Sequence, residues 1–206
     1  MMKLVIGDKN LSSWSLRPWL AARQAGFSFV EVPVSLRGAK TRAEIFKHSP
    51  SGKVPCLIDG DTVVWDSLAI CEYLAEQAPT LWPADRSVRA EARAVSAEMH
   101  SGFSGMRQSM SMDIRAAKPG AGRTPEALDD IARIATIWEG CRRRFAADGP
   151  FLFGNFSIAD AMYAPVVWRF RTYAVELPAL AQDWMGSMLA LPAMREWQAG
   201  ALSEPA

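Results

Sequence analysis

Apolar positions change spacing several times within residues 1–78, and this alternation predicts strands and helices in turn. Short apolar runs predict strands over residues 3–7, 29–34, 56–58 and 62–65. Apolar residues three and four apart predict helices over residues 13–25, 41–48 and 66–78. Asp59-Gly60-Asp61, between the last two strands, is typical of a hairpin. The order βαβ-α-ββα therefore predicts a sheet that begins with a parallel pair and ends in an antiparallel hairpin.

The spacing is helical throughout the rest of the chain. One apolar stripe predicts a single long helix from Val88 to Met110. Further stripes predict helices over residues 125–145 and 158–173, and two shorter helices around Trp184 and Trp197. Because strand signals are absent from this half, we expect it to be all-helical.

This change of pattern predicts two domains. We expect an α/β domain over residues 1–78, a Pro-containing linker over residues 79–85 and an all-helical domain over residues 86–206. The chain has 206 residues, half of them hydrophobic, which is enough for a sizeable core in such an arrangement. Clefts between domains are preferred places for ligand sites, so we expect the functional site there.

Charge and composition exclude several function classes. The formal net charge is +1 at pH 7, so we expect no partner of the nucleic-acid or anionic-membrane kind. The three cysteines, Cys56, Cys71 and Cys141, are odd in number and widely spaced, which fits neither a disulfide framework nor a zinc pattern. With only His48 and His100, we expect no metal site. No apolar run is long enough for a signal peptide or a membrane span, so we expect a cytoplasmic protein.

Ser12 and Ser13 stand where the first predicted strand gives way to the first predicted helix. The start of a helix offers free backbone N–H groups and a partial positive charge. Either serine could cap the helix, or could direct its hydroxyl towards a bound anion or thiolate. The residue pattern leaves both interpretations open, and the function depends on which one holds.

Two other short motifs carry a similar pair of interpretations. Val54-Pro55 opens a strand after a turn-rich loop, and residue type does not decide between a cis and a trans bond. In the cis form, the Val54 backbone could pair with a peptide-like ligand as an added strand does. Asp66-Ser67 could simply cap the third helix. Alternatively, Ser67 could hold a carboxylate while Asp66 faces an ammonium group.

Two faces of the long predicted helix carry further candidates for the cleft. An apolar stripe runs through Met99, Phe103, Met106 and Met110. Another face carries Arg93, His100 and Arg107 at seven-residue spacing. We interpret the stripe as core packing, although methionine also suits adaptable apolar pockets. The three basic residues could point into the cleft or be solvated.

Together these features resemble the cytosolic glutathione S-transferase superfamily over nearly the whole chain, in particular its serine-type, bacterial zeta/theta-like members. The motifs that carry the resemblance are Ser12-Ser13-Trp14-Ser15-Leu16-Arg17, Lys53-Val54-Pro55, Asp66-Ser67 and Ser157-Ile158-Ala159-Asp160. The resemblance implies a thioredoxin-like N-terminal domain, an all-α C-terminal domain, glutathione as co-substrate and a homodimer. The linker residues Leu81 and Trp82, which we expect to be exposed, could contribute to the dimer contact.

The resemblance also implies how glutathione would be held. Val54, before a cis-proline at Pro55, would pair with the cysteinyl backbone of glutathione. Asp66 and Ser67 would hold the γ-glutamyl end, and Lys53 would meet the glycine carboxylate. The Ser-x-x-Asp box is a folding element in this family, which agrees with its form as a capping box.

Catalysis is implied by the same comparison. Ser12 matches the serine that activates the glutathione sulfur in the zeta-class Ser-Ser-Cys-x-x-Arg pattern, with Ser13 as a substitute. Trp14 stands where that class has Cys, which argues against a direct transfer of maleylacetoacetate isomerase chemistry. The expected function is a glutathione transferase acting on a small hydrophobic electrophile. The alternatives are an isomerase of the maleylacetoacetate type and a non-catalytic binding or regulatory protein. Candidates for the electrophile pocket are Trp14, Met106, Arg107 and Met110.

Overall fold

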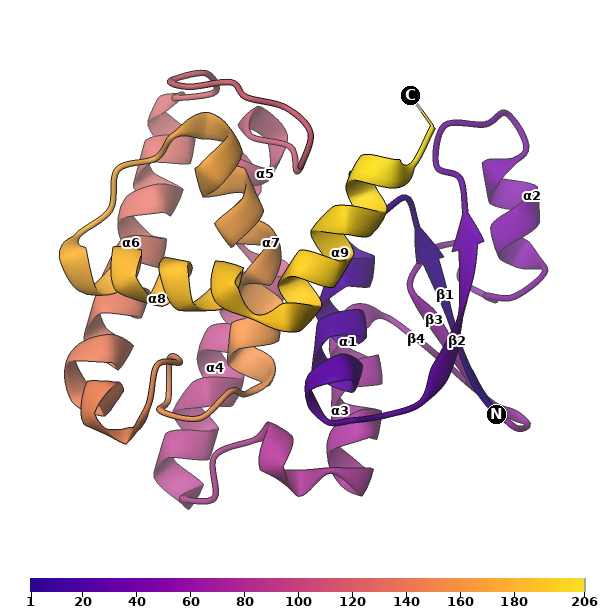
Figure 1. Ribbon diagram of the computed structural model, residues 1–206, viewed down its shortest axis with the longest axis horizontal. Coiled ribbons are helices and arrows are strands. Elements are labelled where there is room, and N and C mark those ends of the chain that lie inside the picture. The colour runs from indigo at the N-terminus through magenta and orange to yellow at the C-terminus, as the bar shows by residue number, and fades with distance from the viewer. Residues whose placement is uncertain (206) are drawn as a thin grey trace.

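Figure 1 shows the computed structural model, which describes residues 1–205 and places a sheet on one side and a bundle of helices on the other. The first part contains β1 (Met2–Gly7), α1 (Ser13–Gln24), β2 (Phe29–Val34), α2 (Thr41–Phe46), β3 (Cys56–Asp59), β4 (Thr62–Trp65) and α3 (Ser67–Gln77). The strand order is β2-β1-β3-β4, with β1 parallel to β2 and antiparallel to β3. β3 and β4 form the antiparallel hairpin. The predicted order of elements and the parallel first pair are therefore confirmed.

Helices build the second part. After a 3₁₀ turn at Pro79–Leu81 come α4 (Arg86–Ser101), α5 (Ser104–Ser109), α6 (Pro125–Phe145), α7 (Ile158–Tyr173), α8 (Ala179–Ala190) and α9 (Pro192–Ser203). A second 3₁₀ turn, Ala146–Asp148, follows α6. The prediction of an α/β thioredoxin-like part followed by an all-α part is confirmed.

Short polar side chains begin several of these helices. Asp85 caps α4 and Thr124 caps α6, through side-chain oxygens that accept backbone N–H groups. Ser157 and Asp160 form the expected capping box of α7. Asp160 is fully buried and also accepts a hydrogen bond from Trp184 Nε1 at 2.8 Å. The structural interpretation of this motif is therefore confirmed.

The single helix predicted over residues 88–110 is wrong. α4 and α5 are separate because Gly102 is extended and Phe103 lies in the left-handed region, at φ 61°. A side chain at Gly102 would meet the carbonyl oxygen of Glu98 at 2.8 Å, so only glycine permits this close approach. Phe103 is nevertheless buried, and the apolar stripe therefore continues across the break.

Leu81 and Trp82 are buried rather than exposed, with 3% and 5% of their surfaces accessible. The expectation that they offer an exposed dimer contact is therefore wrong. Both belong to the main hydrophobic core, and Trp82 Nε1 donates a hydrogen bond to Glu72 of α3 at 3.1 Å. These contacts pack the segment between α3 and α4 onto the body of the protein.

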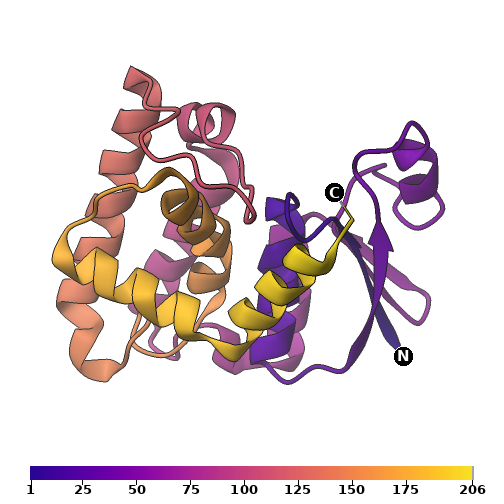
Figure 2. The same ribbon diagram turned by 45° about the horizontal axis from the view of Figure 1, so that its top comes forward.

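Helix α1 lies between the sheet and the helical bundle in both views (Figures 1 and 2). Its Trp19 is fully buried against Trp197 of α9, with the ring centroids 5.0 Å apart. One hydrophobic cluster includes buried residues of both parts, such as Leu4 of β1 and Trp168 of α7. This shared core fixes the N-terminal end of α1 at the junction of the two parts.

Candidate functional site

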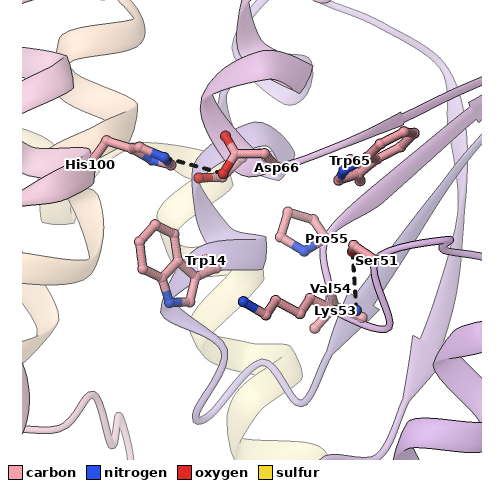
Figure 3. Close-up of a pocket in the computed structure, with 9 residues that line it drawn as sticks. Trp14, Ser51, Lys53, Val54, Pro55, Trp65, Asp66 and His100 are labelled. Atoms are coloured by element: carbon pink, nitrogen blue, oxygen red, sulfur yellow. Dashed lines mark hydrogen bonds and ion pairs between the residues drawn. The ribbon is translucent and has the colours of Figure 1, made fainter.

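A cavity of about 550 Å³ lies beside the starts of α1 and α3 (Figure 3). It is lined by Trp14, Ser51, Lys53, Val54, Pro55, Trp65, Asp66, Ser67 and His100. The fold thus brings together Trp14, the Lys53–Pro55 segment and the Asp66-Ser67 pair, which are far apart in sequence. Ser51 and Trp65 were not predicted as site residues, although Trp65 directly precedes Asp66.

The Val54–Pro55 peptide bond is cis. Pro55 is buried, whereas Val54 is half-buried in the cavity wall. Among residues 1–205, no group forms a hydrogen bond with the N–H or the C=O of Val54. An extended ligand can therefore pair with this backbone in the manner of a strand. The side chain of Lys53 extends from this segment towards Trp14 and brings a positive charge to the cavity (Figure 3).

Asp66 is the N-cap of α3 and has an unusual backbone conformation, with φ 76°. Its Oδ1 accepts hydrogen bonds from the N–H of Leu68 at 2.9 Å and of Ala69 at 3.3 Å. Its Oδ2 lies 3.2 Å from His100 Nε2. Such a backbone conformation costs about 1–3 kcal/mol for a residue other than glycine and is concentrated at functional sites. Asp66 therefore caps the helix and also presents a carboxylate to the cavity.

Ser67 is the first residue of α3, and only 1% of its surface is accessible. Its hydroxyl has no hydrogen-bond partner within the described chain. An unsatisfied buried polar group costs about 1–3 kcal/mol. The adjacent helix N-terminus favours negative charge, so an anionic ligand in the cavity would satisfy both the hydroxyl and the helix.

His100 brings the helical part into the cavity from α4. Its Nε2 faces Asp66, while its buried Nδ1 lacks a partner within residues 1–205. Burial is the main cause that lowers the pKa of His100, Asp66 opposes the shift, and Arg17 and Arg107 reinforce it. Residue spacing left open whether His100 points into the cleft or into solvent, and the structure places it in the cavity.

Two guanidinium groups contact the ring of Trp14. The Arg17 group is 4.3 Å and the Arg107 group 4.9 Å from its ring centroid. Arg17 is fully buried, and its three side-chain nitrogens have no hydrogen-bond partner in the part of the chain that the structure describes. Burial, followed by the charge of Arg107, lowers the pKa of Arg17 to about 9, so it stays positive at neutral pH. The cavity wall at Trp14 is therefore backed by positive charge.

Ser12 and Ser13 are buried at the start of α1, and neither lines the cavity. Ser12 Oγ donates a hydrogen bond to Ser15 Oγ at 2.7 Å. Ser13 Oγ accepts one from Arg169 of α7 at 3.4 Å. The Ser12 side chain forms no capping bond with α1, so the capping alternative does not describe it. The activating role of the two serines remains a prediction.

The other electrophile-pocket candidates lie elsewhere. Met106 and Met110 are fully buried in the core and do not line the cavity, which agrees with the core-packing interpretation of their stripe. Arg107 contacts Trp14 but is not itself among the lining residues. Its guanidinium donates to the carbonyl oxygens of Met99 and Gly102 at the end of α4. Of the four candidates, only Trp14 therefore lines the cavity.

Asn10 holds the loop before Ser12 and was missed by the sequence reasoning. It is 2% exposed. Its side chain donates to Asp113 and accepts the N–H of Arg115, both at 3.0 Å. Its own N–H donates to Glu204 at 3.1 Å. The turn preference of Asn was the only signal in the sequence, and it does not reveal partners so far along the chain.

The three cysteines are free and buried. Burial raises the pKa of Cys141 to about 12 and raises the pKa of Cys71 as well. Neither of these two thiols is therefore an activated nucleophile. Within residues 1–205, no three His, Cys, Asp or Glu side chains are grouped as a metal ion would require.

None of the helices in residues 1–205 has both the length and the apolar character needed to cross a membrane.

Two family models match this chain. The model for the glutathione S-transferase N-terminal domain covers residues 11–77. The model for the glutathione S-transferase C-terminal domain covers residues 114–198. Together they span every cavity-lining residue except His100, and most of the helical part.

The chain is also similar to individual proteins named as glutathione S-transferases or as a probable maleylacetoacetate isomerase. Glutathione S-transferase Z2 of Arabidopsis thaliana is 27% identical over 180 residues, which is 83% of this chain and 80% of that protein. A probable maleylacetoacetate isomerase of Caenorhabditis elegans is 26% identical over 172 residues, 82% of this chain and 78% of that protein. The crystal structure of a theta class glutathione S-transferase from Xanthomonas axonopodis pv. citri, with glutathione bound, is 26% identical with a TM-score of 0.66, and 98% of each chain is covered. On the fold and both domain matches, this chain belongs to the cytosolic glutathione S-transferase superfamily.

Proposed function

We propose that this protein binds glutathione in the cavity beside α3 and transfers it to a small hydrophobic electrophile. The observation that carries the proposal is the buried Ser67 hydroxyl, which lacks a partner within residues 1–205 and lies next to the Asp66 carboxylate. The γ-glutamyl end of glutathione offers a carboxylate and an ammonium group, which complement these two side chains. The glutathione bound in the theta class relative supports this choice of ligand.

The rest of glutathione fits the same cavity. Its cysteinyl backbone would pair with the free N–H and C=O of Val54, as a short added strand. The glycine carboxylate would then lie towards Lys53, which supplies the opposite charge. This orientation directs the sulfur towards the start of α1.

Catalysis requires the glutathione sulfur as a thiolate. A thiol has a pKa of about 8.5, and lowering it by two units requires about 2.7 kcal/mol of preferential stabilisation. One charge-assisted hydrogen bond contributes about 1.5–3 kcal/mol, so a single serine hydroxyl is sufficient. In our proposal Ser12 or Ser13 donates this bond, and the helix N-terminus and Arg17 add to it. The serine keeps its proton, and the thiol proton passes to solvent. The thiolate sulfur then forms a bond to the electrophilic carbon while the bond from that carbon to its leaving group breaks, and the leaving group departs with the electron pair.

Ultraviolet titration of the bound thiolate tests the catalytic part of this proposal. We expect the thiol of bound glutathione to be about two pKa units more acidic than in buffer. Ser67→Ala tests the binding part, and we expect it to weaken glutathione affinity about tenfold or more. Its matched control is Ser96→Ala, because Ser96 is also buried but donates to the Ala92 carbonyl of α4. Equal glutathione affinity in the wild type and Ser67→Ala would remove Ser67 from the site.

A glutathione-dependent isomerase is the second candidate, and the likeness to the probable maleylacetoacetate isomerase favours it. Both activities begin with a glutathione thiolate, so the titration does not separate them. A direct assay does, because an isomerase converts maleylacetoacetate without consuming glutathione. Turnover of that compound at a rate above that of electrophile conjugation would favour the isomerase.

A non-catalytic binding protein is the third outcome. Retention on immobilised glutathione with a normal thiol pKa in the complex, and no conjugation of a panel of electrophiles, would favour it.

A further inference from the structure

The two serines at the start of α1 differ in their hydrogen bonds, and this difference bears on which of them acts. Ser12 Oγ donates to Ser15 Oγ at 2.7 Å, and Ser15 Oγ in turn accepts the N–H of Gly7 at 3.1 Å. Ser12 and Ser15 are both buried. The hydroxyl hydrogen of Ser12 is therefore engaged in tying α1 to the end of β1.

The hydroxyl of Ser13 accepts a hydrogen bond, whereas that of Ser12 donates one. Its oxygen accepts a hydrogen bond from Arg169 Nη2 at 3.4 Å. Within residues 1–205 it donates to no group, so its hydrogen is free for a ligand. Ser13 opens α1 and directly precedes Trp14, which lines the cavity.

Arg169 is suited to polarise this hydroxyl. It comes from α7 in the helical part, is 6% exposed, and is held in place by a second hydrogen bond to the Met110 carbonyl. Burial, followed by the charge of Arg107, lowers its pKa to about 10, so it remains a cation at neutral pH. A cation that donates to a hydroxyl oxygen draws electron density from it, which makes the remaining O–H a stronger donor.

We infer that Ser13, and not Ser12, donates the hydrogen bond to the glutathione sulfur, and that Arg169 is the positioning residue that polarises it. This inference rests on the proposed glutathione-binding function. Ser12 is then part of the scaffold, with its hydroxyl bound to Ser15. The helical part would thereby act directly on thiol activation as well as on electrophile binding.

The test is the pKa of the glutathione thiol in the complex, followed by ultraviolet absorbance of the thiolate. We expect Ser13→Ala to raise this pKa by about one to two units, which is the effect of losing one charge-assisted bond. Ser12→Ala is the comparison variant, and we expect it to raise the pKa by less than Ser13→Ala does. Ser13→Thr retains a hydroxyl and is expected to keep the thiol acidic.

A double-mutant cycle tests the role of Arg169. Arg169→Met is expected to raise the thiol pKa when Ser13 is present and to have no further effect in Ser13→Ala, because its influence passes through that hydroxyl. Arg169→Lys keeps the charge and is expected to recover part of the acidity. It also serves as the folded comparison if Arg169→Met is unstable.

The outcomes are distinct. A raised thiol pKa in Ser12→Ala with an unchanged one in Ser13→Ala would overturn the inference and leave the proposed function intact. An equal effect of Arg169→Met with and without Ser13 would show that Arg169 acts on the sulfur by itself, which also overturns it. A wild-type complex whose thiol is no more acidic than free glutathione would remove the proposed function together with the inference.

Discussion

Asp66 and His100 come from different parts of the molecule, and their side chains meet in one cavity with 3.2 Å between Oδ2 and Nε2. Asp66 caps α3 beside the sheet, whereas His100 lies in α4 of the helical part. If Asp66 also faces the ammonium group of glutathione, the ligand and His100 share one carboxylate. The charge on His100 therefore affects both its contact with Asp66 across the junction of the two parts and the binding of the ligand's ammonium group.

The first prediction concerns the stability of the protein at acidic pH. The pKa of folded His100 is lowered from 6.5, chiefly by burial, so the unfolded chain binds this proton more readily. As pH falls below about 6.5, the free energy of unfolding should therefore decrease. His100→Gln has no such proton and should lose less stability between pH 7 and pH 5, as measured by urea unfolding. His48→Gln retains His100 and is the control. If His48→Gln reduced the loss of stability between pH 7 and pH 5 as much as His100→Gln does, His100 would not be the group responsible.

The same protonation should affect the ligand. Protonated His100 pairs more strongly with Asp66 and competes with the glutathione ammonium. Calorimetric titration at pH 5.5 and pH 7 should show glutathione affinity falling further in the wild type than in His100→Gln.

The second prediction separates the two tasks of Asp66. Asn caps helices about as well as Asp, so Asp66→Asn should change the free energy of unfolding by less than about 0.5 kcal/mol. It removes the charge that would face the ammonium group, so the Kd for glutathione should rise about tenfold or more. Asp85→Asn makes the same change at the cap of α4, outside the cavity, and should leave the Kd unaltered. An unchanged Kd in Asp66→Asn would show that the carboxylate serves only the helix.

The third prediction concerns the unpartnered cation Arg17. Burying a charge without hydrogen bonds costs free energy, and even a buried ion pair can often be replaced by apolar residues of similar size with no loss of stability. We therefore expect Arg17→Met to raise the free energy of unfolding of the ligand-free protein, measured by urea denaturation. Arg23→Met on the same helix is the control. Arg23 pairs with Glu196 at 2.9 Å, so we expect this variant to have a lower free energy of unfolding than the wild type. A large loss in Arg17→Met would indicate an anionic partner that satisfies Arg17 in solution.

The fourth prediction tests the loop before the serines. Asn10→Ala removes two partly buried hydrogen bonds and leaves the N–H of Arg115 without its partner. The free energy of unfolding should fall by about 1–3 kcal/mol. The only other asparagine, Asn155, is exposed, and Asn155→Ala should have an effect below about 0.5 kcal/mol. Equal losses in the two variants would show that the Asn10 contacts do not stabilise the loop.

Periodicity predicted most of the fold because it reports which face of an element is buried. It predicted α7 and the β3–β4 hairpin to within a residue. It failed at Gly102 and Phe103, where the apolar spacing continues although the backbone leaves the helix. A break that keeps its side chains buried has no signature in the spacing of apolar residues.

Sequence motifs predicted which residues gather at the cavity, but not the directions of their side chains. Val54-Pro55 and Asp66-Ser67 were recognisable because backbone and capping preferences are local. The hydrogen bond between Ser13 and Arg169 could not be recognised from the sequence, because it depends on how α7 packs against α1. The partners of Asn10 are likewise set by the tertiary fold.

The contact between α1 and α9 has a consequence for engineering chimaeras in this superfamily. Trp19 packs edge-to-face against Trp197, and Trp197 Nε1 also donates to the Lys9 carbonyl at 2.8 Å. A recombinant that exchanges the whole helical part for that of another member would place an unselected surface against both Trp19 and the loop at Lys9. The units that can be exchanged therefore differ from the two halves of the sequence: α9 should be inherited with the α/β part, and the crossover points should fall after α3 and before α9.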